Sequence, residues 1–508
     1  MASFQIVYDD FSGGQYMGPK STNLPKNSWF GENAIALPNG RLCPVGYQLA
    51  GQNAGVTSST GAQIMDSWTI AGANYSFVIW SGTTSKMCRL LSVNDGSTFP
   101  ITSTDTSLTG TIGGKVAYVP ADSKFYYVNT NSGTFGYIRS VTTGGTDASV
   151  STTLGTGTGI TNLALYGYRL VAWGPTTKRL YYSDTALTGW STSQYYEFNG
   201  QIVNVIPRTN DLLVVCTTGV FSVVGVLGSS VTIQLIVPQQ NVTEGMRDAV
   251  AVNRNVYYLD QQRSGALDGN IYQLLGSSAQ TVATMNLDDV NGAEDGYEKG
   301  RIQTIADGRI VVVLRNGVVY TQTSHGRWAR LVISYDATDS TETNQITIAR
   351  PGPESQNEYF VVGIVQNDTK FPIKWYRVIN NVITGTNTDE DFVFYGSASA
   401  SLNVPVGEVE LAEFWHTKPF TVKEVLVEWG DAGNGTPLVA VKTKPTGLVD
   451  VNSANYSQSD WAYAQETSTG PLVLSRFRGD DGPRGYGVKP VVSFESALIN
   501  RVILMCED

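Results

Sequence analysis

The chain contains only two histidines, His325 and His416, and histidine is the side chain that acid–base catalysis near neutral pH uses most often. His325 lies in the segment TSHGRWAR and His416 lies in EFWHTKPF, in parts of the chain that we expect to belong to different domains. A nucleophilic triad needs a Ser or Cys, a His and an acid within hydrogen-bonding reach, and neither segment signals such a set. We therefore predict that the chain is not an enzyme, and we assign it no catalytic residue and no cofactor.

Carboxylates are the next candidates for chemistry, and they gather in two loops. The segment Asp288–Asp295 offers oxygen atoms that Ca²⁺ could use, but it lacks the D-x-D-x-D-G spacing with a distal Glu. We interpret it as a solvated connection, with calcium binding as the alternative, and predict no metal site. The segment Thr388–Asp391 is interpreted in the same way, as part of a linker.

Aromatic and arginine side chains near turns are candidates for contacts with a partner. The chain has 10 tryptophans and 26 tyrosines, which could stack on sugar rings where they are exposed, although an aromatic packed at a sheet edge is the alternative for each. The loop from Arg476 to Arg484 is rich in charge and glycine and contains an Arg-Gly-Asp triplet, which we interpret as coincidence. The candidate contact positions are Trp190, Trp328, Trp461, Arg476, Arg478, Arg484 and Tyr486.

A repeated unit must position all of these residues. Each unit has an apolar strand, a polar turn and a second apolar strand, often followed by a third, and units begin about 39–53 residues apart. Val, Ile, Tyr, Phe and Thr dominate the strands, and helical periodicity is hard to find. We predict an all-β fold with a β-propeller of six to eight blades, seven being favoured. The units start near Ala62, Lys115, Asn162, Gln201, Asp248, Arg301 and Gln345.

Composition and charge exclude several classes of protein. Charged residues are only 15% of the 508 residues and the net charge is −10, so a general grip on nucleic acid through phosphate neutralisation is not expected. The run Leu212–Thr243 has no charged residue, but its Gly, Ser and Thr interruptions favour three strands over one membrane-spanning helix. The N-terminus lacks the features of a signal peptide. Cysteines without close spacing are predicted to be free, with Cys88 and Cys216 buried in strands; the four are Cys43, Cys88, Cys216 and Cys506.

Three domains are predicted. Residues 1–50 form an N-terminal arm with closing strands, residues 51–400 form the β-propeller, and residues 401–508 form a β-sandwich or jelly-roll-like domain. Many propellers hydrolyse glycans, and the segment Tyr182–Trp190 resembles the Asp-box turn of sialidases, but its Gly and Trp spacing differs and it does not recur. Because paired carboxylates of other glycosidases leave no mark in a sequence, a propeller glycoside hydrolase is kept as an alternative.

Two segments resemble tail proteins of tailed bacteriophages. The opening DFSGG of Asp10–Gly14, followed by Gly40-Arg41-Leu42 and Gly46, is similar to the start of those chains. The stretch Arg179–Gly225 is similar to one that crosses two propeller blades in members of the family. The chain departs from the pattern at Cys43–Val45, where relatives often carry a basic residue before the glycine.

The resemblance implies a structural protein of the virion tail, made in the host cytoplasm. The first role expected for the chain is the nozzle. Copies of the chain would form a ring, with a hexamer favoured, around a conduit through which genome DNA passes without specific binding. An acidic or neutral lumen would let a polyanion slide. Tail adapter or tail fibre proteins are the other expected partners. The alternative role is a tip-associated minor tail protein that binds glycans of the host surface.

Overall fold

The computed structural model of the chain is built from β-strands, with a single turn of 3-10 helix at Pro120–Asp122 among the residues it describes. No helix in that part of the chain is long and apolar enough to cross a membrane. The described residues are 3–16, 24, 28–32, 34–36, 40–44, 46–52, 63–69, 75–81, 85–91, 102–131, 134–151, 153–154, 158–238, 246, 249–252, 254–261, 267–285, 300–304, 310–314, 318–322, 328–332, 345–349, 358–365, 373–379, 407–431, 438–448, 465–466, 473–478, 484–495 and 497–508.

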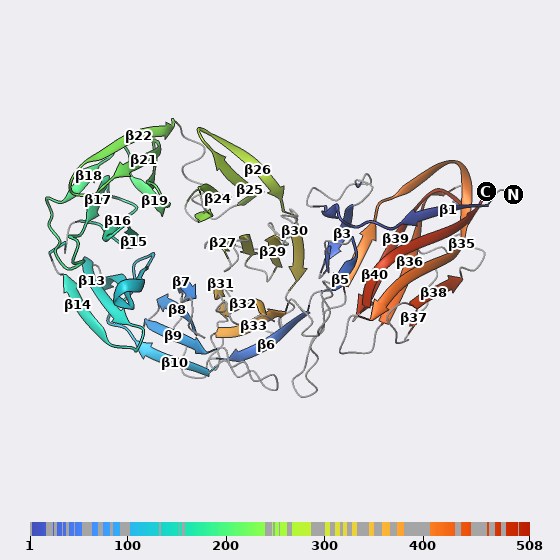
Figure 1. Ribbon diagram of the computed structural model, residues 1–508, viewed down its shortest axis with the longest axis horizontal. Helices are drawn as coiled ribbons and strands as arrows, with labels where there is room; N and C mark the ends of the chain where they lie inside the picture. The colour runs from blue at the N-terminus through green and yellow to red at the C-terminus, as the bar shows by residue number, and fades with distance from the viewer. Residues whose placement is uncertain are drawn as a thin grey trace.

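Four-stranded antiparallel sheets follow one another around a ring (Figure 1). Five consecutive sheets have side chains described throughout most of their strands, and they establish the β-propeller. In chain order they are β11 (Ala117–Val119), β12 (Lys124–Asn131), β13 (Thr134–Thr142) and β14 (Asp147–Ser151); β15 (Asn162–Tyr166), β16 (Arg169–Trp173), β17 (Arg179–Tyr182) and β18 (Tyr195–Glu197); β19 (Ile202–Pro207), β20 (Leu212–Cys216), β21 (Gly219–Gly225) and β22 (Val231–Val237); β23 (Ala249–Val252), β24 (Asn255–Gln261), β25 (Leu267–Leu275) and β26 (Ser278–Thr284); β27 (Gly300–Thr304), β28 (Ile310–Leu314), β29 (Val318–Gln322) and β30 (Trp328–Val332).

The structure establishes five blades, for which both strand pairing and side-chain packing are described, and not the six to eight blades expected from the sequence. Two further four-stranded sheets are described mainly through their backbone pairing. The first contains β7 (Gln63–Thr69), β8 (Tyr75–Ser81), β9 (Lys86–Leu91) and β10 (Thr102–Ser107). The second contains β31 (Gln345–Ala349), β32 (Glu358–Val365), β33 (Ile373–Ile379) and β6 (Gly46–Gln52), so a strand from the start of the chain completes it.

Successive blades are held together by apolar layers. One layer joins β11–β14 to β15–β18 through residues such as Tyr126, Leu163 and Trp190. The next joins β15–β18 to β19–β22, and it includes Trp173 and Val214, both at most 1% exposed. The uncharged run Leu212–Thr243 contains β20, β21 and β22, which confirms the prediction of three strands.

The second unit combines both ends of the chain. Residues 1–50 were expected to form an N-terminal arm with closing strands, and three of their strands pair with C-terminal strands of the same chain: β1 with β40, β3 with β34 and β5 with β40. The apolar side chains of these early strands explain this pairing, because they complete a core rather than face solvent. The strands are β1 (Ser3–Tyr8), β2 (Gly14–Gln15), β3 (Ser28–Glu32), β4 (Ala34–Ala36), β5 (Leu42–Pro44), β34 (Gly407–Leu411), β35 (Phe414–Asp431), β36 (Leu438–Leu448), β37 (Gln465–Glu466), β38 (Val473–Arg478), β39 (Gly485–Glu495) and β40 (Ala497–Glu507).

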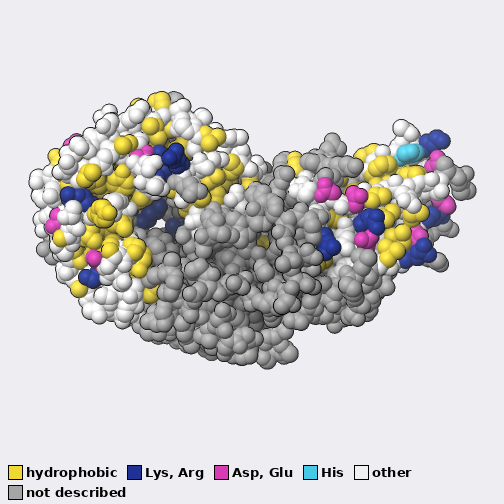
Figure 2. Space-filling view, in the orientation of Figure 1, with side chains coloured by type: hydrophobic (Ala, Val, Ile, Leu, Met, Phe, Trp, Pro, Cys, Tyr) yellow, Lys and Arg dark blue, Asp and Glu magenta, His cyan; other side chains and the backbone are white. Residues whose placement is uncertain are grey.

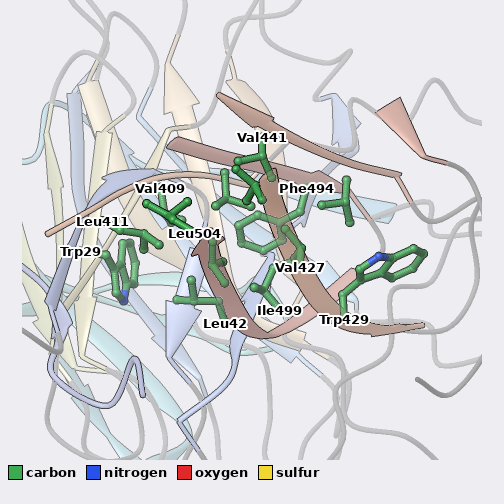
Figure 3. Packing of buried hydrophobic residues seen from close by; sticks show 14 of the residues in the cluster. Trp29, Leu42, Val409, Leu411, Val427, Trp429, Val441, Phe494, Ile499 and Leu504 are labelled. Carbon is green, nitrogen blue, oxygen red and sulfur yellow. The ribbon is translucent and has the colours of Figure 1, made fainter. Parts of the chain in front are cut away.

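The long strand β35 organises the core of this unit. Its first part pairs with β39, and its second part pairs with β40 along Thr421–Asp431. Side chains from the strands on both sides of this change meet in one cluster, which includes Trp29 and Trp429 (Figure 3). Both indoles are fully buried, and Trp429 Nε1 donates a hydrogen bond of 2.7 Å to Ser475 Oγ.

The two units meet at the outer strand β30, which contacts β2, β3 and β4. Gln15 is buried at this junction. Its Nε2 donates to the carbonyl of Gly31 at 2.7 Å, and its Oε1 accepts the backbone N–H of Arg330. One side-chain amide therefore connects the propeller to the second unit. Figure 1 places both chain termini at the opposite end of that unit, away from the ring.

Candidate functional site

The tryptophans proposed as stacking platforms in the propeller are not exposed. Trp190 is 6% exposed and Trp328 is 7% exposed, and each belongs to an apolar layer between blades. An indole covered on both faces cannot stack on a sugar, so these two predictions are wrong and the packed alternative holds. Trp461 and His325 lie outside the described residues, as do the acidic segments 288–295 and 388–391.

The turn that resembles an Asp box has a structural role. Asp184 Oδ1 accepts the backbone N–H groups of Thr188 at 3.1 Å and of Gly189 at 3.0 Å. Leu187 adopts a left-handed conformation with φ of 64°, and its carbonyl accepts Trp190 Nε1 at 3.3 Å. The carboxylate is thus used to fold the β17–β18 connection over Trp190, which explains why an aromatic beside a turn is buried.

Two other carboxylates in the ring are held by arginines. Asp147 accepts Thr109 Oγ1 at 2.7 Å, Arg139 Nε at 3.2 Å and Tyr127 OH at 2.9 Å. Asp211 accepts Arg208 Nε at 2.7 Å and Ser222 Oγ at 2.5 Å. Burial alone would raise the pKa of each carboxyl, but these hydrogen bonds outweigh burial and keep both pKa values below the ordinary value. Both groups are ionised structural anchors rather than acids with a proton to donate.

The described cysteines are buried and free. Cys506 belongs to the core cluster of the second unit, Cys43 is buried in β5, and Cys216 lies in β20. Burial raises the pKa of Cys216 and of Cys506 to about 12, so neither thiol is a ready nucleophile. The side chain of Cys88, in β9, is outside the described residues. The described part of the chain also contains no group of three or more His, Cys, Asp or Glu placed to hold a metal ion.

Exposed polar and aromatic groups do gather on the second unit, at a bulge in β35. Pairing between β35 and β39 shifts between Trp415 and Phe420, so the intervening residues stand out from the sheet. Trp415 is 53% exposed and lies beside Gly487, where an added Cβ would come within 3.1 Å of indole Cδ2. The glycine therefore leaves room for the indole against the strand.

Two predicted contact residues are near this bulge. Arg484 is exposed and its Nη2 donates to the carbonyl of Pro419 at 2.8 Å, and Tyr486, at the start of β39, is 40% exposed. His416 stacks on Phe4 with ring centroids 4.8 Å apart. We call Trp415, His416, Lys418, Arg484 and Tyr486 the tip surface; Trp415 is on the sheet face of its partner Gly487, and Tyr486, the residue before Gly487, is on the other face. Figure 2 shows basic, acidic and histidine side chains gathered at the outer end of this unit.

The other two predicted arginines lie on β38. Arg476 Nε is 2.6 Å from Glu424 Oε1 on the neighbouring strand β35, so its charge is already paired. Arg478 is placed by its backbone, opposite Glu424 in the β35–β38 register, while its side chain is outside the described residues. The structure therefore joins Arg484 and Tyr486 in one surface and assigns Arg476 to a cross-strand ion pair.

A second exposed surface lies on the outer rim of the propeller. Val224, Val226, Ile233 and Leu235, on β21, β22 and their connection, are 39–64% exposed, and we call them the apolar rim. Figure 2 shows hydrophobic side chains gathered along this part of the ring. The strand β22 has no charged residue and no proline, although outer strands usually carry such residues as protection against unwanted pairing.

The other outer strands with described side chains are protected. β14 begins with Asp147 in its ion pair, β18 has only three residues and ends in Glu197, β26 exposes mainly small and polar side chains, and β30 is covered by β2, β3 and β4. Among the outer strands with described side chains, the apolar rim therefore belongs to one blade. The alternation of apolar and polar residues in the segment VTIQLIV could have indicated that Ile233 and Leu235 share one face of a strand. No sequence pattern could have indicated the exposure of Trp415, because its partner Gly487 is remote in sequence.

Comparisons with known proteins identify no family for this chain. No protein-family model matches the chain, and no curated protein matches it. Among solved structures, the WD40 β-propeller domain of Doa1 is similar at 11% identity, over 68% of this chain and 98% of that chain, with a TM-score of 0.39. Virginiamycin B lyase from Staphylococcus aureus matches at 8% identity over 66% and 98%, with a TM-score of 0.43. The N-terminal domain of Nup159 matches at 11% identity over 72% and 100%, with a TM-score of 0.42.

Proposed function

We propose that this chain is a non-enzymatic structural component of a bacteriophage tail, in which several copies form a ring that serves as the nozzle. The observation that carries the assembly part of the proposal is the apolar rim. Exposed bulky side chains on an uncharged edge strand are costly in water and favour burial against another protein surface. We assign the rim to contacts between copies of this chain, with a hexamer as the ring that the family resemblance implies.

The segments that carry the resemblance have structural roles, as a scaffold protein requires. Phe11 of the DFSGG segment donates its backbone N–H to the carbonyl of Gly40 at 3.0 Å, so two motif pieces distant in sequence lie together. Phe11 and Leu42 are buried in the core of the second unit. The stretch Arg179–Gly225 runs from β17 to β21, across two adjacent blades.

We further propose that all seven four-stranded sheets are blades of one closed ring, and that the second unit is a jelly-roll-like β-sandwich. Contacts of β31 with β27 on one side and with β7 on the other support closure. The shared strand β35 and the common core around Trp429 support two facing sheets. In this arrangement the sandwich is available to tail adapter or fibre proteins, and genome DNA passes through the ring of copies without specific binding.

Oligomeric state tests the assembly role. The double substitution Ile233→Lys with Leu235→Lys places two charges on the apolar rim, and we expect it to convert rings into monomers in native mass spectrometry. Leu474→Lys is the matched control, because Leu474 is 60% exposed on β38 of the second unit. Wild-type protein that stays monomeric, or a rim variant that assembles like wild type, would contradict the assignment of the rim. Circular dichroism verifies that each variant is folded.

Placement in the virion needs a separate test. Antibody raised against the purified chain should label the distal end of the tail in immunogold electron microscopy of phage particles. Absence of label from every particle would refute the tail proposal itself, whatever the oligomeric state. A label along the whole tail would also contradict the nozzle.

The tip surface favours one alternative role, a tip-associated protein that binds host-surface glycans. Its specific observation is the exposed indole of Trp415 beside Gly487, with the exposed Arg484 just before the paired strand β39. Aromatic faces stack on the apolar faces of sugars, and an arginine provides hydrogen-bond donors to hydroxyl or acidic groups. Trp415→Ala should weaken binding to host cell-wall glycans by roughly threefold to tenfold. Equal binding by the variant and wild type would remove this role.

A further inference from the structure

A lysine lies at one end of the channel that the blades surround. Lys115 is two residues before β11, which is the innermost strand of its blade. The innermost strands of the next two blades are β15 and β19. Figure 2 shows an opening in the ring with Lys or Arg side chains at its wall. The position is notable because the chain as a whole carries a net charge of −10.

The backbone of Lys115 is fixed by the adjacent blade. Its N–H donates to Asn162 Oδ1 at 2.8 Å, and its carbonyl accepts the N–H of Leu163 at 2.9 Å. Both partners are at the start of β15. The lysine therefore enters the channel from a rigid point, not from a long loop.

The ammonium group is fixed one blade further on. Lys115 Nζ donates to Asn204 Oδ1 at 3.0 Å, so the side chain crosses the blade of β15–β18 and reaches β19. Asn204 is 1% exposed and is itself held in place: Nδ2 donates to the carbonyl of Met246 at 2.8 Å, and Oδ1 also accepts the N–H of Val205 at 2.8 Å. A buried asparagine thus holds the ammonium in one place.

The charge of Lys115 is not neutralised by the described residues around it. Lys115 is partly exposed and makes no ion pair within the described part of the chain. The strands β11, β15, β19 and β23 contain no acidic residue, and β27 contributes Arg301. Asp66 is in β7, with its side chain outside the described residues. An ammonium has three donors, and the bond to Asn204 uses one of them.

We propose that this end of the channel is a binding site for a small oxyanion, such as phosphate or a carboxylate, with Lys115 as its principal ligand. The preorganised ammonium, the neutral polar groups around it and the lack of acids on four neighbouring inner strands favour an anion over a cation. A side chain with only a structural role at this position would need a neutral hydrogen-bond donor and no charge. The site is independent of the proposed tail function, because it is formed within one chain.

The test is a titration of the full-length chain with inorganic phosphate, followed by isothermal calorimetry at constant ionic strength, with acetate as a second titrant. Lys115→Met keeps the apolar stem and removes the charge, and it should weaken phosphate binding by about tenfold or more. Lys178→Met is the matched control, because Lys178 is an exposed lysine between β16 and β17. It should bind phosphate as wild type does.

A second variant separates charge from folding. Asn204→Asp keeps the shape of the side chain but provides a carboxylate that pairs with Lys115, so phosphate binding should again be lost while Lys115 is present. Wild-type protein without saturable binding of phosphate or acetate would overturn the proposal. So would folded Lys115→Met protein, verified by circular dichroism, that binds phosphate with unchanged affinity. Binding of acetate alone would restrict the site to carboxylates.

Discussion

The ion pair between Arg208 and Asp211 gives the sharpest test of how the blades are held. The two side chains are 21% and 10% exposed, and Arg208 also donates Nη1 to the carbonyl of Arg254, in the turn of the next blade, at 3.0 Å. Asp211→Asn removes the negative charge but leaves Arg208 in place. Removing one member of a buried pair typically costs about 3 kcal/mol, because the remaining charge stays desolvated. We therefore expect a loss of this order in the free energy of unfolding of the ring.

The control is an exposed ion pair in the preceding blade. Arg179 Nε is 3.5 Å from Glu197 Oε2, with side chains that are 45% and 55% exposed, so Glu197→Gln should have little effect. The assay is urea unfolding of wild type and both variants, monitored by tryptophan fluorescence. Equal effects of the two substitutions would refute the reasoning, since it depends on burial.

The pKa of Asp211 determines how the stability difference between wild type and Asp211→Asn depends on pH. Burial raises the pKa of this carboxyl, but the hydrogen bonds from Arg208 and Ser222 prevail and hold it below its ordinary value of 3.8. A depressed pKa in the folded state contributes stability that is complete above the unfolded-state pKa and is lost as pH falls through the folded-state pKa. The stability difference between wild type and Asp211→Asn should be constant near pH 7 and shrink below about pH 4. A difference that grows with acidification would contradict the assigned charge state.

Three further predictions concern packing. Gly174→Ala should strongly destabilise the propeller in thermal unfolding, because a Cβ there would lie 1.7 Å from the carbonyl oxygen of Gly159; an unchanged melting temperature would contradict the close approach. Cys216 should not react with a thiol reagent until the protein is unfolded, since burial raises its pKa to about 12, and rapid reaction of native protein would show that it is accessible. Gln15→Ala should increase limited proteolysis between the two units, because it removes the contact with Arg330; an unchanged cleavage pattern would show that this contact does not restrain them.

The repeats were predictable because each blade is a local unit. Every expected unit start lies within about two residues of the start of an inner strand, as the innermost strand of each blade carries the apolar run that follows a polar connection. Asn162 and Gln345 coincide with the starts of β15 and β31. Exposure was less predictable. Trp190 is next to a turn but is covered by it, since Asp184 folds the connection over the indole.

Pairing between the chain ends could not be inferred from the sequence. Ser3 is opposite Glu507 in the β1–β40 register, and an isolated strand such as SFQIVY carries apolar alternation without information on its partner. The composition of the tip surface also depends on long-range pairing and could be predicted only in part. Arg484 and Tyr486 were recognisable from a charged, glycine-rich loop, but Trp415 becomes part of the surface only through its pairing with Gly487 on β39.

The same long-range pairing couples the ring to the second unit. β5 ends at Pro44 in the second unit and β6 begins at Gly46 in the propeller, so one residue separates a strand of one unit from the closing strand of the other. A displacement of the second unit would therefore be transmitted directly to β6, whose pairing with β33 completes the last sheet. The buried amide of Gln15 forms a second connection at β30. Two short connections at different sheets restrain rotation better than one flexible linker, which makes the two units suited to act as one rigid block in an assembly.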